Sequence, residues 1–241
     1  MAALALSLSS ASAQIPEKFT NLQILPKDIS RPDLVTRMRW FAGALGVRCN
    51  HCHVGANPAT LEGFDFASDE KETKKVARAM MHMVQEINEK LLPTTGRAKP
   101  HTVSCITCHR GAALPLTLYE VLTETARKDG VEAALKQYRE LREKHYGDGL
   151  FDFGSGSLSP LAESLAREQK DLDGALAVAR VNAEFHPSEP GVHVLIGQIC
   201  VSKGDRDCAV AAYGKAAELD PNNPWMQKQL EAAKALPKPS N

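Results

Sequence analysis

Apolar residues recur at helical spacing in two stretches of the N-terminal half of the chain. The first stretch predicts a helix that begins near Pro32 and ends near Gly46, because proline suits a first helical turn and glycine suits the turn out of a helix. Its apolar face consists of Leu34, Met38, Phe41 and Leu45. The second stretch predicts a helix over residues 69–91, with Ser68, Asp69 and Glu70 at its N-terminal end. Its apolar face consists of Val76, Met80, Met83, Val84 and Ile87.

The C-terminal half is also predicted to be helical, and from about Leu161 it repeats with a period of 34 residues. In this repeat Asp171 aligns with Asp205 and Pro187 aligns with Pro221. Residues 116–150 favour a connecting helix pair, and the segment 151–160 favours a break after it. Residues 223–236 are typical of a capping helix that covers the exposed end of a repeat array. The pattern as a whole therefore predicts a mainly α protein.

Composition and charge narrow the function classes. The chain has 241 residues, of which 24% are charged and 43% hydrophobic, a balance typical of neither disordered nor membrane-embedded proteins. The 29 basic and 29 acidic residues cancel, which argues against nucleic-acid binding. No run approaches the ~18 apolar residues that a transmembrane segment needs. The charge is unevenly placed, since residues 14–115 are net basic and residues 116–241 are net acidic.

The first 13 residues form a short run of apolar and small residues that ends in Ala11-Ser12-Ala13. This pattern is typical of a secretory signal peptide with its cleavage site, although the run lacks the usual N-terminal Lys or Arg. A disordered tail is the alternative. We therefore expect residues 1–13 to be a signal peptide and the mature protein to be periplasmic or extracellular.

Four of the six cysteines fall into two C-x-x-C-H motifs, each of which is the attachment signature of c-type haem. In such a motif the two thiols form thioether bonds to the vinyl groups of the porphyrin, and the adjacent histidine is the proximal ligand of the iron. The sequence therefore predicts two covalently attached haems. The attachment residues are Cys49, Cys52 and His53 in the first motif, and Cys105, Cys108 and His109 in the second.

A redox-active dithiol and a zinc site are the two alternatives to haem for these cysteines. A thioredoxin-like dithiol belongs on a βαβ pattern, and the sequence shows none. A zinc site suits Cys and His ligands, but it would require the two motifs to converge on one ion. Each motif is already a complete haem site, so haem is the favoured interpretation.

A sixth ligand for each iron is expected on the helix that precedes each motif. Met38 lies about three helical turns before the first motif, and its thioether is a recognised haem ligand. Met83 is the first candidate for the second haem and Met80 is the next, with His82 and His101 as competitors that would give bis-histidine ligation. The choice matters because Met/His ligation raises the reduction potential.

The two helix-and-motif stretches resemble the cytochrome subunit of photosynthetic reaction centres, over roughly residues 19–113. The resemblance implies that Met38 and Met83 are sixth ligands and that His53 and His109 are proximal. That family carries four haems, whereas this chain has motifs for two. What the resemblance implies for this chain is therefore the role of an exported electron-transfer module. The expected domains are 14–115 for the two-haem cytochrome domain and 151–241 for the repeats.

The second copy of the 34-residue repeat resembles a tetratricopeptide repeat, with Gly197, Ala209, Tyr213, Ala216 and Pro221 at the positions of that pattern. The remaining cysteines, Cys200 and Cys208, flank the turn between the paired helices of this copy. A disulfide between them is favoured in an oxidising compartment, and two buried thiols are the alternative.

These features favour an electron-transfer protein without catalytic residues. Repeat domains present surfaces for protein docking, so redox partner proteins are the expected partners. One alternative is a haem filament formed by self-association, in which electrons pass along stacked haems. A second and less favoured alternative is a dihaem peroxidase with one haem left open.

Overall fold

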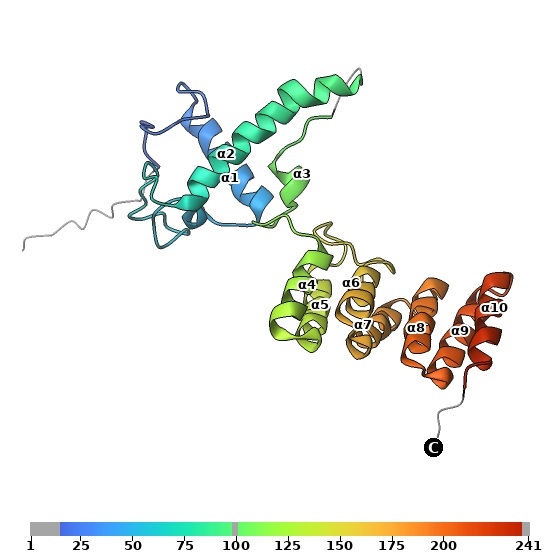
Figure 1. Cartoon of the computed structure of the whole chain (residues 1–241). Helices are drawn as coiled ribbons and strands as arrows, with labels where there is room; N and C mark the ends of the chain where they lie inside the picture. Colours follow the sequence, from blue (N-terminus) through green and yellow to red (C-terminus); the bar gives the residue numbers. More distant parts are fainter. Residues whose placement is uncertain (1–14, 98–100, 238–241) are drawn as a thin grey trace, which may run out of the picture. The chain divides into compact units, whose positions relative to one another are not determined.

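The computed structural model describes residues 15–97 and 101–237, and the expected signal peptide lies outside the described residues. The regular secondary structure of the described chain is helical, apart from one isolated antiparallel bridge between Val54 and Asp65. This result confirms the prediction of a mainly α fold. The chain divides into two compact units between Pro115 and Leu116 (Figure 1).

The first unit contains two long helices and one short helix. A 3₁₀ turn, Cys49–His51, follows the first of them, and a π-helical turn, Ile87–Leu91, directly extends the second. The helices are α1 (Arg31–Leu45), α2 (Glu72–Glu86) and α3 (Cys105–His109).

The limits of α1 follow from local chemistry, and they confirm the predicted helix. Ser30 is the N-cap, and its side-chain oxygen accepts a hydrogen bond from the backbone N–H of Asp33 at 3.2 Å. Pro32 lies in the first turn, where a missing N–H costs no hydrogen bond. Gly46 ends the helix in the left-handed conformation, with φ of 64°.

The N-terminal limit predicted for α2 is wrong by three residues, since the helix begins at Glu72. The Asp69 carboxylate does not cap the helix, because it accepts hydrogen bonds and forms ion pairs with other groups, chiefly Arg78 at 2.8 Å and Lys74 at 3.2 Å. The Ser68 hydroxyl likewise accepts a bond from the Glu70 N–H in a turn before the helix. At the other end, the π-helical turn continues α2 to residue 91, as predicted.

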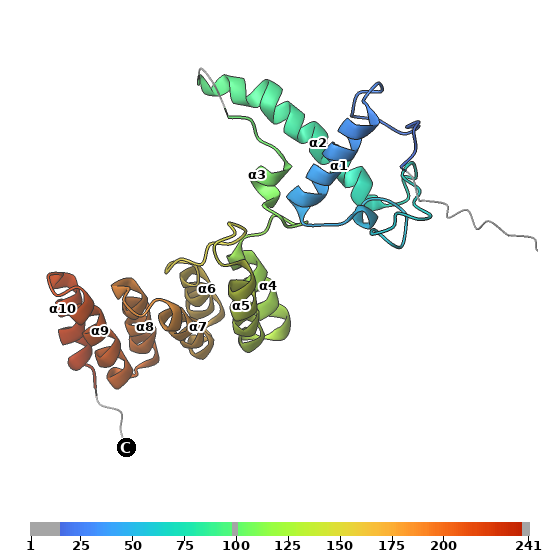
Figure 2. The same cartoon turned by 180° about the vertical axis from the view of Figure 1, so that it is seen from behind.

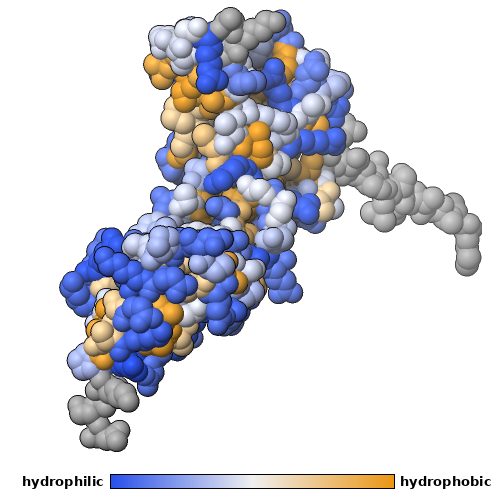
Figure 3. Space-filling view, turned by 90° about the vertical axis from the view of Figure 1, so that its right-hand side faces the viewer, coloured by the Kyte–Doolittle hydropathy of each residue, from blue (hydrophilic) through white to orange (hydrophobic). Residues whose placement is uncertain are grey.

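The first unit has almost no hydrophobic core made of protein. Among its described residues, Leu34 and Ala44 are the buried hydrophobic side chains. Orange patches break the hydrophilic surface of this unit in Figure 3. Large hydrophobic side chains that remain exposed are Trp40, Val76, Met80, Met83, Leu91, Ile106 and Leu114. A chain of this size normally buries most of its apolar side chains, so these helical faces lack a covering partner.

The two long helices do not cover each other. They cross in the views of Figures 1 and 2, but α1 packs mainly against α3, and the described residues form no extensive α1–α2 interface. The first unit is therefore a set of helices arranged around apolar faces that protein atoms leave open.

The second unit is a stack of helices with a continuous core. The helices are α4 (Leu118–Asp129), α5 (Val131–His145), α6 (Ser159–Ser164), α7 (Leu172–Phe185), α8 (Pro190–Lys203), α9 (Arg206–Leu219) and α10 (Pro224–Lys234). Leu122 of α4 and Tyr138 of α5 lie fully buried in the same core as Leu161 of α6 and Val178 of α7. The helix pair expected as a connection, residues 116–150, therefore shares its core with the helices that follow.

A 34-residue displacement relates successive elements of this unit. Helices α7 and α9 have the same length, and their N-cap residues Asp171 and Asp205 each accept a hydrogen bond from the backbone N–H three residues on. The turns before these caps contain Lys170 and Gly204, both in the left-handed conformation. The sequence repeat is thus also a repeat of backbone conformation.

Close packing joins α8 to α9. Gly197 of α8 lies against the ring of Tyr213, and a Cβ atom at that position would be 2.9 Å from the ring. Cys200 and Cys208 are joined in a disulfide between the two helices, as predicted. Beyond them, α10 buries Met226 and Ala233 at the end of the stack.

No helix of the described chain combines the length and the apolar character that a membrane crossing requires.

Candidate haem sites

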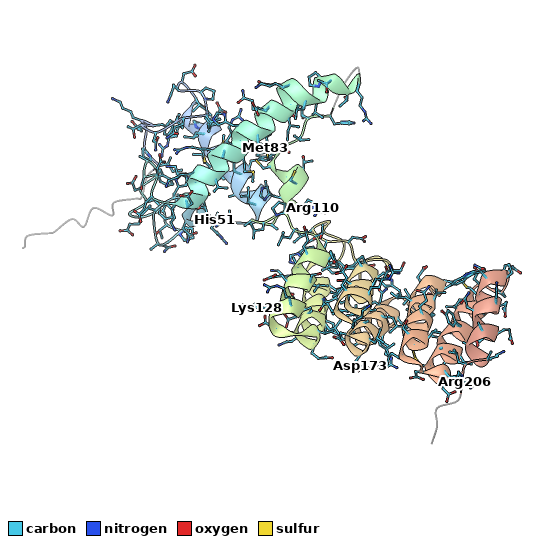
Figure 4. The ribbon with its side chains drawn as sticks, in the orientation of Figure 1. His51, Met83, Arg110, Lys128, Asp173 and Arg206 are labelled. Carbon is cyan, nitrogen blue, oxygen red and sulfur yellow. A yellow bond between two sulfur atoms is a disulfide. The ribbon has the colours of Figure 1, made fainter. Side chains whose placement is uncertain are left out.

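The first C-x-x-C-H motif forms a compact turn directly after α1. The backbone N–H of His53 donates to the carbonyl oxygen of Cys49 at 3.0 Å, which brings the ends of the motif together. The Cys49 and Cys52 side chains are half-buried free thiols. The hydroxyl of Thr73 donates a hydrogen bond to the carbonyl oxygen of His51, so the start of α2 is attached to this turn. Figure 4 shows His51 near the start of α2.

The second motif is the helix α3 itself. One helical turn places Cys105, Cys108 and His109 on neighbouring positions of one face. Asn88, in the π-helical turn after α2, forms two hydrogen bonds with Val103 and so holds the segment that precedes α3. Its amide nitrogen donates to the Val103 carbonyl at 2.8 Å, and its amide oxygen accepts from the Val103 N–H at 2.8 Å.

The ring of His109 is oriented for metal ligation. Its Nδ1 atom lies 2.9 Å from the carbonyl oxygen of Ala112, which can only accept, so Nδ1 carries the proton and donates. In the neutral form of the ring, this tautomer leaves the lone pair on Nε2. A backbone carbonyl that fixes the tautomer in this way is typical of histidines that bind metal through the other nitrogen.

The ring of His53 is more enclosed. Its Nδ1 atom is buried and finds no hydrogen-bond partner among the described residues. The ring packs edge-on against Phe66, with the ring centroids 5.1 Å apart. Burial lowers the pKa of His53, and the nearby Lys74 ammonium lowers it further, so the neutral imidazole that iron binds is the favoured form.

The motif thiols lack the features of a zinc site. Burial raises the pKa of Cys52 and of Cys105, which favours the thiol over the thiolate that zinc prefers. Within the described ranges, no three His, Cys, Asp or Glu side chains gather around a common metal position. Each motif instead presents two cysteines and one histidine, which is the set of residues that a c-type haem uses.

The candidate sixth ligands differ in exposure. Met38 on α1 is half-buried, while Met83 and Met80 on α2 are 45% and 40% exposed. His82 and His101 are both exposed. Figure 4 shows Met83 near the middle of the long ribbon that α2 and the π-helical turn after it form together. The exposed thioethers of α2 fit a role as ligands of a group that covers this face of the helix, and the assignment of Met38 and Met83 stays a prediction.

A backbone contact links α1 to the second motif. The N–H of Gly111, two residues after His109, donates to the carbonyl oxygen of Ala44 at 3.0 Å. Gly46 lies so close that a Cβ atom there would be 1.9 Å from the Gly111 oxygen. Both long helices therefore hold both motifs. Helix α1 leads into the first motif and contacts the chain after the second. Helix α2 contacts the first motif, and the chain after it leads to the second.

Several residues that shape these sites carry no signal in the sequence. Thr73, Lys74 and Asn88 lie on an ordinary polar helix face, and nothing in the spacing distinguishes Lys74 from Lys71 or Lys75. Their roles depend on contacts with loops that lie far away in the chain, which periodicity does not report.

Residues 7–148, more than half of the chain, match the family described as photosynthetic reaction centre cytochrome C subunit. The chain belongs to this family. The resemblance predicted from the two motif stretches is thereby confirmed for the N-terminal part of the chain. Proteins of this family bind c-type haem and transfer electrons.

Two curated relatives of this family member show how far the similarity extends. Cytochrome c-554 of Chloroflexus aurantiacus is 33% identical over 92 residues, which is 38% of this chain and 20% of that cytochrome. The photosynthetic reaction center cytochrome c subunit of Thermochromatium tepidum is 32% identical over 110 residues, 44% of this chain and 24% of that subunit. The matched segment thus spans a quarter or less of each relative.

Proposed function

We propose that this family member is an exported c-type cytochrome with two haems that passes electrons between redox partner proteins. One observation carries the proposal. Two complete C-x-x-C-H motifs lie in a unit whose helices expose Val76, Met80 and Met83 instead of burying them. Two apolar macrocycles attached at these motifs would supply the missing core.

Each part of the site has a definite task in this proposal. The sulfur atoms of Cys49, Cys52, Cys105 and Cys108 hold the two haems covalently. Nitrogen atoms of His53 and His109 would be the proximal ligands, and the Met38 and Met83 thioethers would be the sixth ligands. A bound c-type haem supplies a one-electron iron couple, which the protein tunes through its ligands and surroundings. Irons held by both ligands would have no open position, which favours electron transfer over peroxide chemistry.

We further propose that the second unit is a tetratricopeptide-repeat domain that docks the redox partners. Support comes from the 34-residue displacement between α7 and α9 and from the Gly197–Tyr213 contact between paired helices. Stacked helix pairs of this kind present extended surfaces for protein binding.

An oxidising compartment, periplasmic or extracellular, is proposed for the mature protein. The disulfide between Cys200 and Cys208 supports this location, because structural disulfides persist mainly outside the cytosol. Thioether attachment would also remove the four motif thiols from oxidation.

The proposal is tested by the haem content of protein produced in a host that attaches c-type haem. We expect two haems per chain, retained after denaturation because the bonds are covalent. The Cys49→Ala/Cys52→Ala double variant should keep one haem. The Cys200→Ser/Cys208→Ser double variant is the matched control and should keep both. A wild-type chain without covalent haem, or a motif variant that still carries two, would contradict the proposal.

The same preparation separates the alternatives. A high-spin ferric spectrum at rest together with peroxide turnover would favour a peroxidase. Light scattering that shows long polymers would favour the filament.

A further inference from the structure

An unusual charge lies beside the first motif. Among the residues that the structure describes, Lys74 is the one buried side chain that carries a formal charge, and it is 8% exposed. Buried lysines are rare because the ammonium loses its hydration, and they are retained where hydrogen bonds and counter-charges hold them.

The contacts of the Lys74 ammonium place it against the loop that follows the first motif. Its Nζ atom donates to the carbonyl oxygens of Phe66 at 3.0 Å, Ala67 at 3.2 Å and Ser68 at 2.6 Å. The ring of Phe66 is in turn the one that packs on His53. Phe66 therefore lies between the Lys74 ammonium and His53, the expected proximal histidine of the first site. It also lowers the pKa of both Cys52 and His53, as expected of a nearby positive charge.

The counter-charge does not neutralise this region. Asp69 is the acidic partner of Lys74, with 3.2 Å between Nζ and Oδ1, but it also pairs with Arg78 at 2.8 Å. Two positive groups thus share one carboxylate. Asp65 also acts on His53, but more weakly than Lys74 and Arg78 do, so the positive charge prevails at that ring. Because Lys74 and Arg78 are largely buried, salt screens this charge less than it screens surface lysines.

Reduction of a haem adds one electron, so the reduced site carries one positive charge fewer. A fixed positive charge nearby stabilises the reduced state relative to the oxidised state. Resting on the proposed function, we propose that the buried ammonium of Lys74 raises the reduction potential of the haem attached at Cys49 and Cys52. Lys74 is then a positioning residue for the loop and also a charge that favours the reduced form of the first haem.

Redox titration of the purified two-haem protein tests this inference. The Cys49→Ala/Cys52→Ala variant, which retains the second haem, identifies which couple belongs to which site. At an effective dielectric constant of about 20, two unit charges about 12 Å apart interact by an amount that changes a one-electron equilibrium roughly tenfold. Lys74→Gln should therefore lower the reduction equilibrium constant of the first haem about tenfold, or ~59 mV for one electron, and leave the second couple in place.

Three further variants separate charge from structure. Lys74→Arg keeps the charge and should keep the potential of the first haem. Lys75→Gln removes the same charge from the neighbouring, 52% exposed position and should move either couple less than about threefold, because exposed charges are screened. Asp69→Asn removes the counter-charge and should raise the potential of the first haem. Loosening of the loop alone would not shift Lys74→Gln and Asp69→Asn in opposite directions.

Several outcomes would overturn the inference. In the first, Lys74→Gln leaves the reduction potential of the first haem unchanged. In the second, Lys74→Arg lowers that potential as much as Lys74→Gln does. In the third, Asp69→Asn lowers that potential instead of raising it. If Lys74→Gln does not take up haem, the sign of the Asp69→Asn shift decides. A wild-type chain with no haem couple at all would overturn the proposed function and this inference together, whereas two normal couples indifferent to Lys74 would overturn the inference alone.

Discussion

Met83 and Met80 lie one turn apart on α2 and have similar exposure, 45% and 40%, so they form a matched pair for testing sixth-ligand identity. Replacing Met83 with Ala should remove the spectroscopic signature of sulfur-ligated iron from one of the two haems. It should also lower the potential of that haem, because Met/His ligation raises the potential. Met80→Ala should leave both properties unchanged.

Absorption spectra and redox titration of the two variants give the answer. If Met80→Ala, and not Met83→Ala, removes the sulfur signature, the ligand is Met80. If neither variant does so, the ligand is a histidine, and the exposed His82 and His101 are next in line.

Asp69 supplies a pH dependence at the scale of a single residue. Hydrogen bonds from Arg78 and Asn21 lower the pKa of Asp69 far below its ordinary value. A carboxyl group with a depressed pKa in the folded state stabilises the fold above its unfolded pKa of ~3.9, and loses that contribution as the pH falls towards the folded pKa.

The expected result is a lower melting temperature for Asp69→Asn than for the wild type at pH 7. The gap should stay constant down to about pH 4 and shrink below it, where the wild-type carboxylate begins to lose its advantage. Thermal unfolding at a series of pH values measures this gap. A gap that widens under acid conditions would contradict the assignment.

At the scale of helices, the contact between the end of α1 and the chain after α3 fixes how the two motifs sit within the first unit. Gly46→Ala would place a methyl group 1.9 Å from the Gly111 oxygen and would force a side chain onto a left-handed backbone, φ 64°. We expect a loss of about 2 to 4 kcal/mol in the free energy of unfolding, from backbone strain and overpacking together.

Gly63→Ala is the control for this substitution. Gly63 has φ of 69°, but a Cβ atom there meets nothing within 4 Å, so only the backbone cost of about 1 kcal/mol remains. Denaturant unfolding of the haem-loaded protein compares the two. Equal losses for the two variants would show that the α1–α3 approach contributes nothing to stability.

At the scale of the whole molecule, the two units differ in what makes them fold. The second unit buries a continuous core, whereas the described part of the first buries Leu34 and Ala44 alone among hydrophobic side chains. Residues 116–241 produced alone should therefore unfold cooperatively on heating. Residues 14–115 produced without haem should show no cooperative transition, because too little apolar surface is buried to offset chain entropy.

Far-UV circular dichroism during heating distinguishes the two behaviours. Haem-loaded 14–115 is the control and should regain a cooperative transition. Cooperative unfolding of haem-free 14–115 would contradict the view that the haems form its core.

Local features of this protein were accessible from the sequence because short-range chemistry determines them. The limits of α1 follow from Ser30, Pro32 and Gly46, and the 34-residue repeat follows from recurring caps such as Asp171 and Asp205. Each C-x-x-C-H motif is likewise complete within five residues. The mainly α fold and the family of the N-terminal part were predictable for the same reason.

Tertiary structure decided everything that depends on residues distant in the chain. Helix α2 starts three residues later than predicted, because Asp69 pairs with Arg78 and Lys74 instead of capping the helix. Gly46 and Gly111 meet across the first unit, which no spacing rule reports. The sequence does not distinguish Lys74 from Lys75. In the structure, Lys74 is buried against the loop after the first motif, whereas Lys75 is exposed. Periodicity gives the face of a helix, whereas burial and the electric field at a site depend on which distant groups pack against that face.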